Sequence, residues 1–165
     1  MIIAETKRLS LEKFDMFDLD EYFEIISNDD LLKKFVPGAC PSTLQGAARL
    51  LSHYVSCDFN NSFSIIIKNK QTLQIIGSLQ AYKISSTTLH VSYLLGEKFR
   101  NKGFMKEALG SFIDYILQSN KAYSSFRFTI EKDNIASENV VKSFGATVFR
   151  ELDSHCIWQL KIKNF

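Results

Sequence analysis

The spacing of apolar and polar positions divides this chain into helical and extended segments. Apolar and polar residues alternate from Lys7 to Lys13, which predicts a strand. Apolar residues three and four positions apart then predict one helix from about Asp18 to Ser27 and a second from Ser42 or Thr43 to about Ser56. Between these helices, Asn28 to Pro41 contains acids, prolines and a glycine, so we expect a short helix followed by a turn-rich loop.

In the middle of the chain the pattern becomes extended. Phe63 to Lys68, Leu73 to Ile84 and Thr88 to Leu95 are rich in β-branched and aromatic residues, and short turns separate them. Strands joined by such short turns form an antiparallel meander. A wide apolar stripe from Gly103 to about Ser119 then predicts a long helix.

The last third of the chain alternates again between the two patterns. We expect a strand at Ser124 to Ile130, a helix from Ile135 to Phe144 that Gly145 ends, and strands at Ala146 to Leu152 and Cys156 to Lys163. The predicted order is β α α β β β α β α β β. This order indicates an α+β fold with α/β/α layers, in which helices cover both faces of a mixed, mostly antiparallel sheet of about seven strands.

Composition and charge exclude several classes of protein. Of the 165 residues, 45% are hydrophobic and 23% are charged, which is typical of a folded chain, and we expect one domain spanning residues 1–165. The net charge of +2 provides no strong attraction for nucleic acid. The longest uncharged stretch, Phe35 to Ala48, is too short to span a membrane. We therefore expect neither nucleic acid nor a membrane as a partner.

The cysteines indicate a reducing environment. Cys40, Cys57 and Cys156 are odd in number and far apart, and no C-x-x-C pair is present. This pattern predicts neither a disulfide framework nor a metal site, and the cytoplasm is the expected location.

Basic residues and a glycine mark the start of the long predicted helix as a possible anion site. Lys98, Arg100, Lys102 and Lys106 lie within nine residues, and Gly103 allows a ligand to approach the backbone closely. The first N–H groups of a helix have no partner within it and attract anions. A solvated loop with an ordinary turn glycine would have the same composition. Neither a P-loop nor a G-x-G-x-x-G motif is present.

The residues around this turn resemble a known family. Tyr93 to Glu97 (YLLGE) and Arg100 to Leu109 (RNKGFMKEAL) are similar to the acetyl-CoA signature of the GNAT N-acetyltransferase superfamily. Asn134 to Ser137 (NIAS) and Lys142 to Gly145 (KSFG) resemble its second motif, which closes on the other side of the cofactor.

Two earlier segments resemble one branch of that superfamily. Thr6 to Leu11 (TKRLSL), together with Phe35 to Gly38 and Thr43 to Leu44, is similar to the RimJ/RimL-type ribosomal-protein N-terminal acetyltransferases. The resemblance extends from about Thr6 to the end of the chain and preserves the order of the motifs. It implies the GNAT acyl-CoA N-acyltransferase fold and transfer of an acetyl group from acetyl-CoA to a primary amine, by direct attack in a ternary complex.

The resemblance also implies where acetyl-CoA binds. The cofactor would enter a cleft where the strands Thr88 to Leu95 and Ser124 to Ile130 part, and its pantetheine arm would pair with the main chain like an added strand. The implied pantetheine contacts are Tyr93, Leu94 and Leu95. The implied pyrophosphate contacts are the backbone N–H groups of Arg100, Asn101, Lys102, Gly103, Phe104 and Met105.

Candidate catalytic residues are weighed against structural roles. His90 stands where the family often has a glutamate proposed as the base, and an imidazole titrates near neutral pH. A half-buried strand histidine, with ordered water as the base, is the alternative. Ser137 would lie near the cofactor sulfur and Asn134 would bind the cofactor, although both residue types also favour helix caps and turns. Val141 replaces the tyrosine that protonates the departing thiolate in many members.

The acceptor amine is the least defined part of the prediction. Asp29, Asp30 and Phe35 are expected on the acceptor side, where the two acids would attract a cationic amine or would instead cap helices. A protein N-terminus and a small-molecule amine both fit the resemblance, as do a monomer and a homodimer. The alternative function is a noncatalytic acyl-CoA-binding or partner-binding module with a degenerate site, which the valine at 141 and the histidine at 90 would favour.

Overall fold

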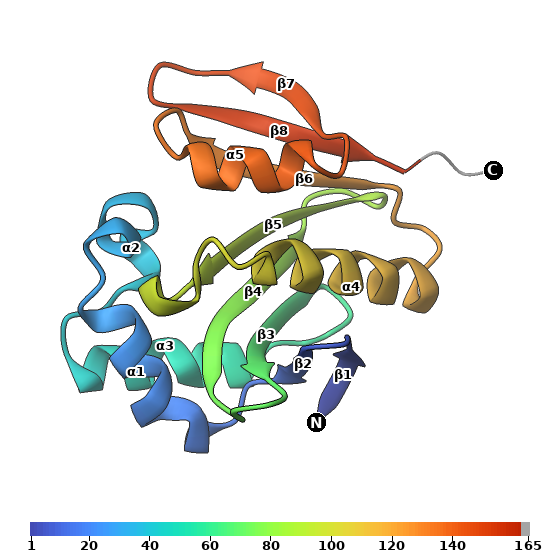
Figure 1. Ribbon diagram of the computed structural model, residues 1–165. Helices are drawn as coiled ribbons and strands as arrows, with labels where there is room; N and C mark the ends of the chain where they lie inside the picture. Colours follow the sequence, from blue (N-terminus) through green and yellow to red (C-terminus); the bar gives the residue numbers. More distant parts are fainter. Residues whose placement is uncertain (163–165) are drawn as a thin grey trace.

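A mixed sheet forms the centre of the protein (Figure 1). The computed structural model describes residues 1–162, and within them eight strands lie in the order β1-β2-β3-β4-β5-β6-β8-β7. The strands are β1 (Ile2–Glu5), β2 (Leu9–Lys13), β3 (Ser62–Asn69), β4 (Ile75–Lys83), β5 (Thr88–Leu95), β6 (Ser125–Glu131), β7 (Thr147–Glu151) and β8 (His155–Lys161). Neighbouring strands are antiparallel, except that β5 and β6 are parallel.

Five α-helices connect and cover these strands. They are α1 (Leu19–Ser27), α2 (Asp30–Phe35), α3 (Leu44–Val55), α4 (Phe104–Ser119) and α5 (Ile135–Lys142), and short 3₁₀ turns lie at Met16–Asp18, Pro37–Ala39 and Glu97–Phe99. From Lys7 onward the structure follows the predicted order, with one addition: α2, the short helix expected within Asn28 to Pro41, was not counted in that order.

The prediction of about seven strands falls one short of the eight strands in residues 1–162, because it did not include β1. This four-residue edge strand is exposed or half-buried along its length, so its sequence shows no alternation. The predicted start of β4 at Leu73 is also wrong, since Leu73 is exposed and has a left-handed backbone (φ 60°) in the preceding turn. The predicted continuation of the last strand to Lys163 lies outside the described residues.

Polar side chains define where the helices begin. Thr43 accepts a hydrogen bond from the N–H of Gly46 and caps α3, as its sequence position predicts. Asp18 does not cap α1 with its side chain. Instead, Asp15 caps the preceding 3₁₀ turn, and the Asp18 carboxylate pairs with Lys68 of β3 at 3.0 Å. Asp18 therefore ties the start of the first helix to the sheet through its ion pair with Lys68.

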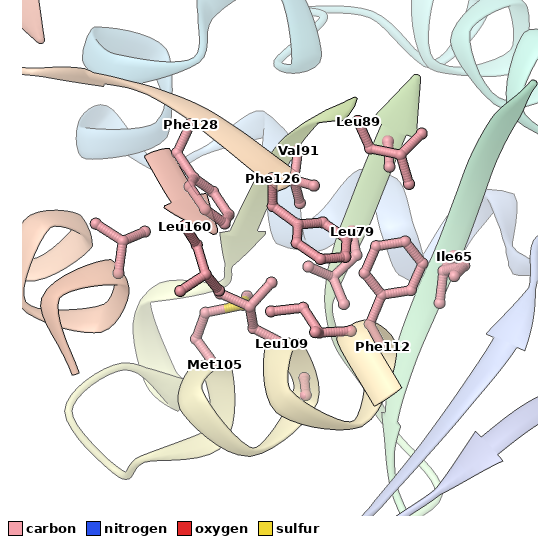
Figure 2. Close-up of a cluster of buried hydrophobic side chains, with 14 of the residues drawn as sticks. Ile65, Leu79, Leu89, Val91, Met105, Leu109, Phe112, Phe126, Phe128 and Leu160 are labelled. Atoms are coloured by element: carbon pink, nitrogen blue, oxygen red, sulfur yellow. The ribbon is translucent and has the colours of Figure 1, made fainter. Parts of the chain in front are cut away.

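The larger core lies between α4 and the sheet. The buried stripe of α4 packs against apolar residues of the central strands and of β6 and β8. Figure 2 shows Met105, Leu109 and Phe112 of this helix pointing toward Phe126, Val91 and other sheet residues. Leu109, Phe112 and Phe126 have no exposed surface. This packing fixes the start of α4 beside the end of β5.

A second core lies on the opposite face of the sheet. There, Tyr22 and Ile26 of α1 and Leu51 of α3 pack with Ile66 and Leu94. The prediction that helices cover both faces is therefore confirmed. No helix in residues 1–162 is long and apolar enough to cross a membrane.

Candidate functional site

A cleft opens in the sheet where β5 and β6 part. The two strands pair only from Thr88 to His90 of β5, which lie opposite Ser125 to Arg127 of β6. Beyond His90, the edge of β5 that faces β6 pairs with no strand in the part of the chain that the structure describes. The cleft lies between the second half of each strand, the end of α2 and the start of α5. It is lined by Phe35, Val36, Val91, Ser92, Tyr93, Phe128, Thr129, Ile130, Glu131, Asn134 and Ser137.

Tyr93 joins the two walls of this cleft. Its hydroxyl donates a hydrogen bond of 3.0 Å to the backbone carbonyl of Ser137, at the start of α5. Its ring lies 6.3 Å from that of Phe128 on the opposite strand. Burial raises the pKa of the Tyr93 phenol well above its ordinary value, so the hydroxyl remains a neutral donor.

The turn before α4 presents a series of free backbone N–H groups. Asn101 (φ 59°) and Gly103 (φ 75°) are both left-handed, and no side chain caps the helix. Within residues 1–162, none of the N–H groups from Asn101 to Lys106 donates to a protein acceptor. Such a concave run of donors at a helix N-terminus is an anion site. The side chains of Phe104 and Met105 are buried in the core, which holds the donors in place.

Arg8 supports this turn from β2, and sequence reasoning missed its role. Its Nε donates to Glu107 at 2.6 Å, its Nη1 donates to the Lys102 carbonyl at 3.0 Å, and its guanidinium covers the Phe104 ring. Burial works to raise the pKa of Glu107, but hydrogen bonds from Thr6 and Arg8 outweigh it and hold the pKa below its ordinary value. The contact joins positions 99 apart in sequence, so no local pattern reveals it.

Arg100 and Asp29 form an ion pair, which changes the predicted role of Asp29. The buried Asp29 carboxylate accepts hydrogen bonds from the Arg100 guanidinium and from the N–H of Leu32, so it also caps α2. Arg100 donates a further hydrogen bond to the carbonyl of Leu95. The predicted attraction of a cationic amine by Asp29 does not fit this geometry, because both of its oxygens are engaged. Instead the pair links the anion-binding turn to α2.

The other predicted acceptor residues fall in different places. Phe35 lies in the cleft at the end of α2. Asp30 is exposed in the first turn of α2, outside the set of residues that line the cleft. Glu131, which sequence reasoning missed, is the carboxylate that lines the cleft. Its position at the end of β6 becomes visible only when the parting of the strands is known.

His90 lies on β5 at the point where the strands part. Its Nε2 is 3.0 Å from the Thr129 hydroxyl, and its ring stacks on Tyr82 at 4.9 Å. The Nδ1 atom is buried and has no partner among the described residues. Burial lowers the pKa of His90 below its ordinary value of 6.5, so the ring is neutral near neutral pH. Its lone pair is therefore available to accept a proton.

Ser137 and Asn134 both lie at the start of α5, in the cleft. The Asn134 side chain accepts a hydrogen bond of 3.2 Å from the Ser137 N–H, and so it caps the helix. The Ser137 hydroxyl has no hydrogen-bond partner among the described residues. Val141, one turn further along α5, is fully buried. The structure thus brings His90, Tyr93, Asn134 and Ser137 to one cleft. No group of three metal-binding side chains occurs in residues 1–162.

Comparison with known proteins identifies the family. The sequence profile of the acetyltransferase (GNAT) domain matches residues 8–147, which is most of the chain. The protein therefore belongs to the GNAT acetyltransferase family. No curated protein matches the chain in sequence.

Solved structures share the fold at low sequence identity. An acetyltransferase from Salmonella typhimurium that modifies the N-terminal serine of ribosomal protein L7/L12 is 16% identical, with a TM-score of 0.84 over 99% of this chain and 100% of that chain. RimL in complex with coenzyme A is 17% identical, with a TM-score of 0.84 over 98% of each chain. The self-immunity acetyltransferase MccE, in complex with acetyl-CoA and AMP, is 19% identical, with a TM-score of 0.79 over 95% and 94%. The fold is thus that of the GNAT acetyltransferases.

The left-handed glycine before α4 provides a test of the anion site. We predict that Gly103→Val raises the Kd for acetyl-CoA at least about tenfold, because a β-branched residue at φ 75° costs roughly 1–2 kcal/mol and moves the donors. Isothermal titration measures the effect. Leu73→Val is the matched control, since Leu73 is also left-handed (φ 60°) but lies in the exposed turn before β4, outside the cleft and the hollow. Equal acetyl-CoA affinity in the two variants would contradict the assignment of this turn.

Proposed function

We propose that the protein is an acetyl-CoA-dependent N-acetyltransferase that acts on a primary amine. The observation that carries this proposal is the succession of two backbone surfaces: the edge of β5 after His90, which pairs with no strand in residues 1–162, is followed beyond the Glu97–Phe99 turn by the free N–H groups of Asn101 to Lys106. An extended chain that ends in a pyrophosphate matches both surfaces, and acetyl-CoA has this form.

The residues present fit each part of acetyl-CoA. The main chain of Tyr93, Leu94 and Leu95 would bind the pantetheine arm as an added strand. The turn from Arg100 to Met105 would hold the pyrophosphate through its N–H groups. Beyond Gly103, an open hollow of about 560 Å³ along the outside of α4 has room for the nucleotide. Lys106 lines this hollow together with Glu5, Glu107 and Asp114. Lys70 pairs with Glu5 and Arg8 pairs with Glu107, which offsets the charge of those two acids.

The cleft also contains groups that can move the required protons. Acetyl-CoA supplies an acetyl thioester for direct attack by a neutral amine in a ternary complex. The Thr129 hydroxyl lies between the cleft and His90 Nε2, so a proton from the attacking amine passes through Thr129 to the imidazole. Because Val141 carries no donor, the Ser137 hydroxyl would donate a hydrogen bond to the departing thiolate, and the thiolate would take its proton from solvent water. Asn134 holds the start of α5, and Ser137 with it, beside the cleft.

The acceptor is a protein N-terminus or a small-molecule amine. Phe35 and Glu131 line the acceptor side of the cleft. Similarity in fold to enzymes that modify ribosomal proteins favours a protein N-terminus. We place the enzyme in the cytoplasm, since Cys40, Cys57 and Cys156 are all free thiols.

Two measurements separate this function from a noncatalytic acyl-CoA-binding module. We expect acetyl-CoA to bind in isothermal titration and to release free thiol steadily in the presence of a suitable amine. No binding at hundreds of micromolar acetyl-CoA would contradict both functions. Binding without turnover on a broad panel of peptides, amino acids and polyamines would favour the noncatalytic module, which is the alternative that the buried Val141 supports.

The role of His90 generates a pH prediction. The folded pKa of His90 lies below 6.5, so we expect kcat/KM to fall as the pH drops through that lower pKa, where the ring gains its proton. We expect His90→Gln, which keeps the polar shape without the basicity, to lose roughly 100-fold in kcat/KM. The acetyl-CoA Kd should change little, since the cofactor contacts are main-chain groups. If His90→Gln kept the wild-type kcat/KM, and if its kcat/KM fell at the same acidic pH as that of the wild type, His90 would not be the base.

A further inference from the structure

One face of the sheet beside the cleft is not covered by helices. On β8, and on β6 from Phe126 onward, alternate residues are buried and the residues between them are exposed or half-buried. All of β7 is exposed. α1 and α3 lie on this side of the sheet but pack on β3 and β4. An open surface formed by β6, β8 and β7 therefore adjoins the cleft.

Strand register aligns this surface with the candidate base. Residues directly opposite each other share a face, and His90 of β5 lies opposite Arg127 of β6. Arg127 in turn lies opposite Gln159 of β8, and Gln159 lies opposite Thr147 of β7. The row that begins at His90 thus continues without a break to the edge of the sheet.

The Arg127 side chain packs on a neighbouring aromatic ring of this surface and has no ion-pair partner among the described residues. Its guanidinium lies 3.9 Å from the centre of the Phe149 ring, so the side chain extends across β8 to β7. Its buried Nε has no hydrogen-bond partner within residues 1–162. A planar guanidinium fixed on an aromatic ring is arranged for a bidentate carboxylate.

Two further cations share the surface. Arg150 lies opposite Ile157, and Lys161 lies opposite Ser125, which places both on the same face as Arg127. Both are exposed, and neither has an ion-pair partner among the described residues. Glu131 is the acidic residue of this face on β6, and it lies at the cleft end. The charge thus changes from acidic at the cleft to basic at the edge.

We infer that this basic surface, formed by Arg127, Arg150 and Lys161 around Phe149, binds acidic side chains of a polypeptide whose N-terminal amine is acetylated in the cleft. The inference rests on the proposed function. Glu131 at the cleft is complementary to the amine, and the basic edge is complementary to carboxylates further along the same chain. The surface therefore selects acceptors by the residues that follow the reacting amine.

The distances favour a polypeptide over a free amino acid. Neighbouring strands are about 4.8 Å apart, so the Phe149 platform on β7 lies roughly 10–14 Å from the amine beside β5 and β6. An extended chain spans at most about 3.3–3.6 Å per residue. The carboxylates that reach Arg127 are therefore those about three to four residues from the N-terminus. The α-carboxylate of a free amino acid is too close to its own amine to reach.

The test compares two peptides with the same N-terminal alanine. One carries Asp or Glu at positions 2 to 5, and the other carries Asn or Gln at the same positions. We expect wild-type kcat/KM, measured by thiol release, to be at least about tenfold higher for the acidic peptide. Arg127→Gln should abolish this preference, and Arg127→Lys should retain part of it. Arg49→Gln is the matched control, since Arg49 is an exposed arginine of α3. This variant should prefer the acidic peptide as strongly as the wild type does.

A binding measurement keeps the test independent of turnover. The N-acetylated forms of both peptides, labelled with fluorescein, are titrated in the presence of CoA and followed by anisotropy. Tighter binding of the acidic form, lost in Arg127→Gln and weakened by 0.5 M salt, supports the surface. Equal kcat/KM and affinity for the two peptides would overturn it. So would a preference for free amino acids over their amides that depends on Arg127, or tighter binding of a short RNA than of the acidic peptide.

The outcomes separate this inference from the proposed function. Steady turnover with an amine but without a preference for the acidic peptide would contradict the role of the surface, and the proposed acetyltransferase function would stand. Absence of acetyl-CoA binding, together with binding of the acidic peptide that depends on Arg127, would contradict the proposed acetyltransferase function, and the peptide-binding role of the surface would stand.

Discussion

Main-chain N–H and C=O groups inside a sheet need partners, and β5 loses its neighbour halfway along its length. Pairing with β6 ends at His90, whereas pairing with β4 on the other side continues to Leu95. Each buried backbone group left without a partner is unfavourable by about 1–3 kcal/mol. The free edge of β5 is thus a surface on which an extended ligand gains hydrogen bonds, and the other parts of the site are arranged around it.

The turn that follows β5 extends the same surface with donors alone. Its conformation is fixed by side chains from distant parts of the chain: Arg8 and Glu107 hold its end at the start of α4, and Arg100 pairs with Asp29. Because Asp29 also caps α2, the helix that carries Phe35 into the cleft is tied to the turn that would hold the pyrophosphate. The turn before α4 and the helix α2 are therefore tied together through one partly buried ion pair.

Local sequence patterns predict much of this architecture but little of its side-chain chemistry. The bounds of β5 and the start of α4 follow from alternation, from the apolar stripe and from Gly103, because these signals lie within a few residues. Of the two roles left open for Asp29, the structure shows the helix cap, whereas its ion pair with Arg100 could not be predicted because the partner lies 71 positions away. Arg8 and Thr129 were missed for the same reason. The short β1 was missed because an exposed edge strand has no buried face to reveal its period.

Amide hydrogen exchange with and without acetyl-CoA tests the central claim, that the free edge of β5 and the turn before α4 form one ligand surface. The account predicts that acetyl-CoA slows exchange in Val91 to Leu95 and in Asn101 to Lys106, and that α3 and β3 are unaffected. Unchanged exchange in both segments at saturating acetyl-CoA, or protection confined to another part of the protein, would contradict it.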